Sequence, residues 1–392
     1  MKKTAFKKLA GLLAIMVCIA NAANAQDKIN VTTSAVPFLR ISPDARSGGM
    51  GDVAIATSAD PNAVFWNRAK LPFATAPIGV SLSYTPWFKD LGINDVFLGS
   101  ASGYYQLDEN QTLSLGFRYF SLGNIEFTRE DGTPLNSYNP REYGLDVGYS
   151  RKLSPKSGLS VAIRYINSKL ASGTYGGQTY KAASAVAGDI SFYHHGLDDA
   201  GEGFNWGIAI SNLGSPIKYT SDASQKDYLP ANLGIGASYT HIFDEDSKIT
   251  LAIDMNKLLV PAPPFISDDS LTSSDSAALN KYHTQGVASS WFSSFSGGNQ
   301  LQLIDISTGA EFWYQDQFAF RAGYFYENPN NGNRKYFTLG AGLKYNTFGL
   351  NFSYLIPSGN GVTRLPLSNT LRFSLSVDFG TTDDDSKSPS TE

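Results

Sequence analysis

Histidine and serine are the side chains of this sequence that could support catalysis or bind a metal ion. The chain has four histidines: His194, His195, His241 and His283. None lies in a metal-binding spacing such as His-Glu-x-x-His. The pair at 194–195 precedes two aspartates, Asp198 and Asp199, and we expect it in a solvated turn. Ser238 lies an odd number of residues from His241, so in a strand the two face opposite sides. With no Gly-x-Ser-x-Gly elbow either, the sequence predicts no catalytic residue, metal site or cofactor.

Three glycines, Gly48, Gly49 and Gly51, raise the possibility of a phosphate-binding loop. Neither a preceding strand nor a following Gly-Lys-Ser/Thr is present, so the order that a P-loop requires is missing. Glycine also lets a chain turn tightly and brings its backbone close to a neighbouring surface. We therefore expect a compact segment here that presses against the wall of a larger structure.

That larger structure is predicted by alternating residues from 78 to 379. Leu113, Leu115 and Phe117 alternate with small or polar residues, so one face of an extended strand is apolar and the other is polar. Each such segment is close to the ~9 to 11 residues with which a tilted strand crosses a bilayer. The fourteen segments are 78–85, 95–105, 112–119, 143–151, 157–167, 183–193, 205–212, 231–243, 247–256, 302–314, 317–326, 336–346, 348–355 and 371–379.

The connections between these segments alternate in length. The short ones are 106–110, 153–156, 244–246, 315–316 and 346–347. The connection 194–204 belongs to the same end of the barrel but is longer than these turns. The intervening ones are 86–94, 122–142, 168–182, 213–230, 257–301, 327–335 and 356–368. Outer-membrane barrels have short periplasmic turns and long outer loops. The sequence therefore predicts an all-β fold, an antiparallel transmembrane β-barrel of about 14 strands in the outer membrane, with both ends periplasmic.

Charged residues occupy strand positions that face inward if their apolar neighbours face lipid. They are Arg118, Asp146, Arg164, Asp189, Asp254, Arg321, Lys344, Arg372 and Asp378. Because their signs are mixed, we expect internal ion pairs that hold a plug in a hydrated lumen. The alternative is a selective ion channel, although an open pore more often carries one dominant sign.

The two ends of the chain differ from the barrel region. Residues 1–25 have basic residues, an apolar stretch and Ala23-Asn24-Ala25, as in a signal peptide cleaved before Gln26. A lipoprotein acylated on Cys18 is the alternative, which the bulky Val17 disfavours. Cleavage leaves 27 basic and 35 acidic residues. Because this net charge is negative, we do not expect the protein to bind nucleic acid. We expect a hatch or plug at 26–77, the barrel at 78–380 and a disordered acidic tail at 381–392.

The segment before the barrel carries a family resemblance. The stretch from Phe38 to Arg46, followed by Gly48-Gly49-Met50-Gly51, resembles the N-terminal signature of the PorV proteins of Bacteroidetes, outer-membrane components of the type IX secretion system. These are relatives of the FadL fatty-acid transporters. The resemblance implies fourteen strands and a luminal hatch, whose residues here would include Phe38, Asp44, Arg46, Gly48, Gly49, Gly51 and Asn67. Where relatives commonly have Asn-Pro-Ala, this chain has Arg68 in place of the proline, which adds a charge.

The long connection at 257–301 is where we expect specific contacts. Its two ends are apolar and its middle is rich in Ser and Asp. An exposed apolar patch indicates a partner or a fold back onto the rim. The candidates are Leu258, Leu259, Val260, Phe265, Trp291, Phe292 and Phe295, with Trp87 and Phe88 of the first outer loop. A membrane-interface belt explains Trp87 equally well.

Two functions remain open at this point. The resemblance implies a non-enzymatic component of type IX secretion. It would bind the C-terminal signal domains of cargo at the giant translocon barrel and pass them to surface attachment-complex proteins. Some relatives are linked to lipopolysaccharide deacylation, but no residue here identifies that activity. The alternative is a FadL-like transporter of fatty acids or other small hydrophobic molecules, with an apolar pocket lined by Val36, Phe38, Leu39, Val53, Ile55, Phe65 and Trp66.

Overall fold

The computed structural model describes most of the chain between residues 32 and 380. The described ranges are 32–89, 92–128, 132–175, 178–220, 227–261, 263–264, 272–296, 300–358 and 370–380. The expected signal peptide, the acidic tail and Phe265 lie outside these ranges.

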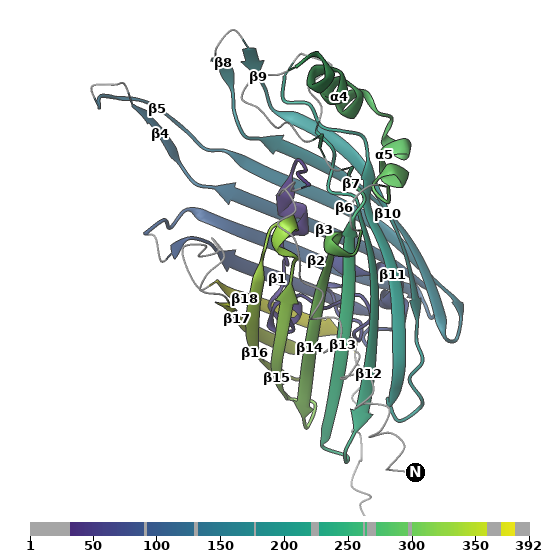
Figure 1. The fold of residues 1–392 in the computed structure, drawn as a ribbon. Helices are drawn as coiled ribbons and strands as arrows, with labels where there is room; N and C mark the ends of the chain where they lie inside the picture. Colours follow the sequence, from purple (N-terminus) through teal and green to yellow (C-terminus); the bar gives the residue numbers. More distant parts are fainter. Residues whose placement is uncertain are drawn as a thin grey trace, which may run out of the picture.

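Fourteen strands in the described part of the chain close into an antiparallel barrel (Figure 1). Each strand pairs with its neighbours in sequence, and β1 pairs with β18 to close the sheet, with Val80 opposite Val377. The fold class predicted from alternation is therefore confirmed. The strands are Ile78–Pro86 (β1), Val96–Asp108 (β2), Gln111–Leu122 (β3), Arg141–Ser154 (β6), Ser157–Lys169 (β7), Ala183–His194 (β10), Gly203–Gly214 (β11), Asn232–Ile242 (β12), Ser247–Leu258 (β13), Ile304–Tyr314 (β14), Phe318–Tyr326 (β15), Lys335–Tyr345 (β16), Phe348–Pro357 (β17) and Leu371–Phe379 (β18).

Burial follows the two-residue period of the strands. In β3, Leu115 is 60% exposed, whereas its neighbour Ser114 is buried. Apolar side chains therefore cover the outer surface and small or polar ones face the lumen, as a bilayer requires. Because every strand has two hydrogen-bonded neighbours, the sheet has no open edge within the membrane.

The outer loops contain further elements. Two hairpins extend beyond the rim: Ile125–Thr128 (β4) pairs with Pro134–Tyr138 (β5), and Gly173–Tyr175 (β8) pairs with Gln178–Tyr180 (β9). The long loop after β13 contains two α-helices, Ser273–Thr284 (α4) and Val287–Ser293 (α5), and the 3-10 helix Gln300–Leu303 (η4). The 3-10 helix Pro329–Asn331 (η5) follows β15. None of the helices in the described ranges is long and apolar enough to cross a membrane.

Residues 32–77, which we call the luminal segment, lie inside the barrel (Figure 1). The segment consists of short elements: Pro37–Arg40 (η1), Ala45–Gly49 (α2), Ala63–Trp66 (α3) and Arg68–Phe73 (η2). The helix α2 contacts β15 to β18, while η2 contacts β3, β6, β7 and β10. The segment thus joins opposite walls of the barrel.

An apolar cluster lies at the outer end of the luminal segment. Val36 and Phe38 of the luminal segment pack there against Leu98, Phe120 and Ile166 of the strands. These side chains are fully or almost fully buried. Burial of this kind stabilises the segment in place by roughly 1.5 to 3 kcal/mol for each large side chain.

Candidate functional site

Ion pairs hold the luminal segment to one wall of the barrel. Arg40 Nη2 lies 2.7 Å from Asp305 Oδ2 of β14. Arg46 Nη2 lies 2.7 Å from Glu311 Oε1 on the same strand. On β18, Arg372 Nη1 donates to Asp52 Oδ1 at 2.9 Å. These pairs are mostly shielded from solvent, where the loss of one partner is strongly destabilising.

A second cluster ties the segment to the opposite wall. Arg68 Nη1 lies 3.0 Å from Asp189 of β10, and its Nη2 lies 3.7 Å from Asp146 of β6. Arg164 of β7 binds the same two carboxylates. The charge that Arg68 introduces is therefore paired in this chain. Seven of the nine luminal charges expected from the sequence are in ion pairs: Asp146, Arg164, Asp189 and Arg372 in the pairs above, Arg321 with Glu311, and Lys344 with Asp378 at 3.7 Å.

Asp254 and Arg118 do not follow the expectation of ion pairs. Asp254 accepts hydrogen bonds from the backbone N–H groups of Ala54 and Ile55, at 2.7 and 2.9 Å. Arg118 donates from Nη1 to the carbonyl oxygen of Leu39 at 2.9 Å. Within the described ranges, no ion pair joins Asp254 to a cation or Arg118 to a carboxylate, and each side chain binds the backbone of the luminal segment instead.

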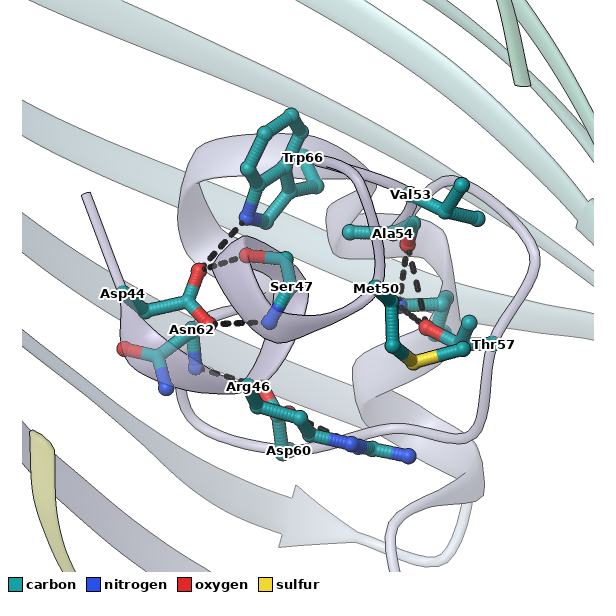
Figure 2. Close-up of a pocket in the computed structure, with 11 residues that line it drawn as sticks. Asp44, Arg46, Ser47, Met50, Val53, Ala54, Thr57, Asp60, Asn62 and Trp66 are labelled. Atoms are coloured by element: carbon teal, nitrogen blue, oxygen red, sulfur yellow. Dashed lines mark hydrogen bonds and ion pairs between the residues drawn. The ribbon is translucent and has the colours of Figure 1, made fainter. Parts of the chain in front are cut away.

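Asp44, one of the residues expected in a hatch, organises the centre of the luminal segment (Figure 2). Its carboxylate accepts hydrogen bonds from Ser47 N at 2.8 Å, from Ser47 Oγ at 2.5 Å and from Trp66 Nε1 at 2.9 Å. The first of these caps the N-terminus of α2, as Asp commonly does. Burial and the neighbouring Asp60 raise the pKa of Asp44.

Lys70 is a buried amine close to this centre. Its Nζ donates to the carbonyl oxygen of Ala54 at 2.6 Å and to Thr57 Oγ1 at 3.3 Å. Burial lowers the pKa of Lys70 to about 8. The amine thus links the turn at 54–57 to η2 by hydrogen bonds that are available in either charge state.

The glycines of the signature allow close backbone contact with the barrel wall. Gly51 has φ +71°, and a Cβ there would lie 2.6 Å from Tyr324 N. A Cβ at Gly48 would overlap the Arg372 side chain, and one at Gly49 would lie 3.0 Å from Gly340 Cα. These contacts explain why the segment needs glycine at these positions. Asn67, also expected in a hatch, donates to the carbonyl oxygens of Ile55 and Phe192, both at 3.0 Å.

A cavity of about 100 Å³ lies between the luminal segment and the strands. Its apolar lining includes Leu39, Ile55, Phe65 and Trp66, four of the residues expected around a lipid pocket. Its polar lining includes Arg40, Arg118, Arg334 and Asp305. The other expected pocket residues lie elsewhere, since Val36 and Phe38 belong to the outer cluster and Val53 packs against Met50.

The helices α4 and α5 lie at the end of the barrel from which the hairpins project (Figure 1). Lys257 of β13 fixes the end of α5 by donating to Ser294 O at 3.0 Å, with its Nζ 5.1 Å from the centre of the Phe295 ring. Tyr228 fixes α4 by donating to Tyr282 O at 2.7 Å. Phe292 is 78% exposed and Phe295 is 49% exposed.

Part of the expected contact surface needs correction. Leu258, Leu259 and Val260 are buried, because β13 continues to Leu258 and Leu259 N bonds to Ala231 O across the rim. Trp87 and Phe88 are partly buried and pack on the apolar cluster at the outer end of the luminal segment. Trp291 is half-buried. Among the described residues, the exposed part of the predicted patch therefore consists of Phe292 and Phe295.

The histidine pair is also less solvated than expected. His194 is the last residue of β10 and stacks on Trp206, and His195 stacks on Phe73 of η2 with ring centres 5.0 Å apart. Burial lowers the pKa of His195. Within the described ranges, no group of three or more His, Cys, Asp or Glu side chains is arranged to hold a metal ion.

Sequence reasoning missed several residues that hold the segment. Asp305 and Glu311 lie on the luminal side of β14. They belong to the same row of every second residue as Ser307 and Gly309. The same alternation that selected the other luminal charges identifies these two. No comparable signal exists for Lys70, because short irregular elements have no period from which burial can be inferred.

Comparison with known proteins identifies the chain. The family model described as "Type IX secretion system protein PorV" matches residues 23–265, which is more than half of the sequence. The chain belongs to the PorV family. No curated protein matches it in sequence. As a PorV-family barrel it is an outer-membrane protein with a role in type IX secretion.

Solved structures of outer-membrane channels share the fold of this PorV-family chain. A deltaS2S3 mutant of the TodX monoaromatic hydrocarbon channel superimposes with a TM-score of 0.51 at 13% identity, covering 85% of this chain and 96% of that one. The Ralstonia pickettii toluene transporter TbuX gives 0.50 at 12% identity, covering 86% and 98%. At such low identity these matches establish the architecture alone.

Proposed function

We propose that this barrel is a non-enzymatic carrier of exported proteins in type IX secretion. In this proposal it binds the C-terminal signal domains of cargo at the giant translocon barrel and delivers them to attachment-complex proteins on the cell surface. Membership of the PorV family is the observation that carries the proposal. The binding surface would be the outer loops, and residues 32–77 would serve as a permanent plug.

The way in which the luminal segment is attached supports binding of cargo at the outer surface rather than passage of cargo through the lumen. Ion pairs on two opposite walls hold the segment, and an apolar cluster covers its outer end. To open the lumen, these buried pairs would have to separate together and the apolar cluster would have to be exposed. A folded polypeptide domain would therefore bind outside the barrel.

The α4–α5 loop supplies a surface suited to such a partner. Phe292 projects from a helix that Lys257 fixes to the rim, so an aromatic side chain is held in place and exposed. Exposed aromatic residues on a rigid support are common anchors in protein interfaces. We propose Phe292 and Phe295 as contact residues for cargo or translocon.

The test is a cell-surface display assay for a tagged cargo protein, with Phe292→Asp as the variant. We expect at least a tenfold loss of cargo binding when such an anchor is replaced by a charge. Ile125→Asp, which alters an exposed apolar residue of another outer loop, is the matched control and should leave display unchanged. Barrel assembly is checked by heat-dependent migration in gels.

Affinity purification in mild detergent distinguishes the two functions. Recovery of a very large barrel and of C-terminal signal domains with the wild type, and their loss with Phe292→Asp, supports the carrier. Normal cargo display in a chain lacking residues 263–292 would show that this loop is not the contact surface. Recovery of fatty acid without any protein partner would instead favour the FadL-like transporter.

A further inference from the structure

The charged residues that line the luminal cavity are paired, with one exception. Arg40 pairs with Asp305, Asp52 pairs with Arg372, and Arg334 pairs with Glu327. Arg118 lines the same cavity and is only 2% exposed. No ion pair joins it to any carboxylate of the described residues.

The carboxylates nearest in the fold to Arg118 are already shared. Asp146, on the strand next to Arg118, lies against both Arg68 and Arg164. Asp189 is shared by the same two arginines. This group therefore contains three guanidinium groups and two carboxylates. A surplus positive charge with so little access to solvent is unfavourable unless an anion balances it.

Hydrogen bonding at Arg118 is incomplete as well. Nη1 donates to Leu39 O, and the guanidinium lies 5.1 Å from the centre of the Phe65 ring. Nε is buried and has no acceptor. Guanidinium N–H groups suit the planar oxygens of a carboxylate and also bind halides.

The cavity beside Arg118 has the composition of a small-anion site. The side-chain amides of Asn212, Asn232 and Asn256 line it. Each amide nitrogen carries two N–H groups, of which Asn212 uses one for Pro230 O and Asn232 uses one for Asn256 Oδ1. Leu39 and Phe65 form an apolar side. A volume of about 100 Å³ accommodates a halide or a carboxylate of a few carbon atoms and is too small for a long acyl chain.

We propose that Arg118 and this cavity bind one small monovalent anion, such as chloride or a short-chain carboxylate. The anion balances the surplus charge of the Arg68–Arg164–Arg118 group and stabilises the luminal segment through Leu39. This site is independent of the outer loops. A negative result in the anion-binding test would therefore leave the proposed role in secretion unaffected.

The test is equilibrium dialysis of the full chain in detergent against radiolabelled acetate and, separately, chloride, with gluconate holding the ionic strength constant. We expect one bound anion per wild-type chain and at least a tenfold weaker affinity in Arg118→Gln. Lys344→Gln, which removes a luminal positive charge outside the cavity, is the matched control and should bind normally.

A second variant separates binding from folding. Ala209 lines the cavity without carrying charge, so Ala209→Leu should fill part of the volume and weaken binding while Arg118 stays in place. We also expect acetate to raise the melting temperature of the wild type but not of Arg118→Gln. Equal acetate affinity in wild type and Arg118→Gln would overturn the proposal, as would binding of decanoate without binding of acetate or chloride.

Discussion

Glu311 provides the sharpest test of how the luminal segment is held. Its Oε1 lies 2.7 Å from Arg46 Nη2, while Oε2 accepts from Arg46 Nε at 2.9 Å and from Arg321 Nε at 2.6 Å. Glu311→Gln keeps the size of the side chain and removes its charge. The two arginines would then lose the carboxylate that they share, with no cavity created.

The expected loss of stability depends on the partners that each arginine keeps in the variant. Arg46 retains Asp60 at 2.8 Å, whereas Arg321 retains the neutral amide of Asn351 at 2.9 Å and the Trp313 ring, whose centre lies 5.5 Å from its Cζ. Breaking a buried pair destabilises by roughly 3 to 5 kcal/mol, and the remaining Asp60 places this case near the lower limit. We therefore expect Glu311→Gln to lower the free energy of unfolding by about 3 kcal/mol.

Urea unfolding in phospholipid vesicles, followed by tryptophan fluorescence, measures this change. Glu245→Gln, in an exposed turn, is the control and should stay within about 0.5 kcal/mol of the wild type. Adding Arg321→Met to Glu311→Gln should recover part of the loss, because the unpaired cation is removed. A loss below about 1 kcal/mol would refute the reasoning, since it would mean that luminal water screens the pair as it does at a surface.

Two further predictions concern the luminal segment. Burial lowers the pKa of Lys70 from 10.5 to about 8, so between these pH values the unfolded chain holds a proton that the folded chain lacks. Stability should therefore rise with pH across this window, by about 3 kcal/mol in total, and Lys70→Met should abolish the rise in urea titrations at pH 8 and 10.5. Gly51→Ala combines a positive φ with a Cβ 2.6 Å from Tyr324 N, and we expect a loss of about 2 kcal/mol or more. Gly92→Ala, where φ is also positive but no atom lies within 4 Å, should lose only about 1 kcal/mol, and equal losses would argue against the close contact.

The strands were predictable because their environment repeats every two residues. Lipid on one side and lumen on the other impose the same alternation on β3 as on β18, so the fourteen segments could be found without any knowledge of contacts. The predicted ends of the strands were less accurate. β13 continues through Leu258, and this extension buries residues that the sequence placed in an exposed loop.

The hairpins and helices of the outer loops were not predicted. β8 and β9 are three residues each, too short to show a period. α4 buries no residue, so its sequence lacks the apolar stripe by which an amphipathic helix is recognised. Its capping box at Thr272 and Asp275 is a signal that could have been used.

The sequence by itself determined the architecture, the membrane and the family, because alternation, loop lengths and the glycine-rich signature are local properties of the chain. It also placed Arg118, Asp146 and Arg164 in the lumen, since parity along a strand sets the face. Only the tertiary structure decided which of these charges meet. Pairing depends on which strands are neighbours and on what the inserted segment brings to them, and it leaves Arg118 beside a cavity while Arg68 takes the carboxylates.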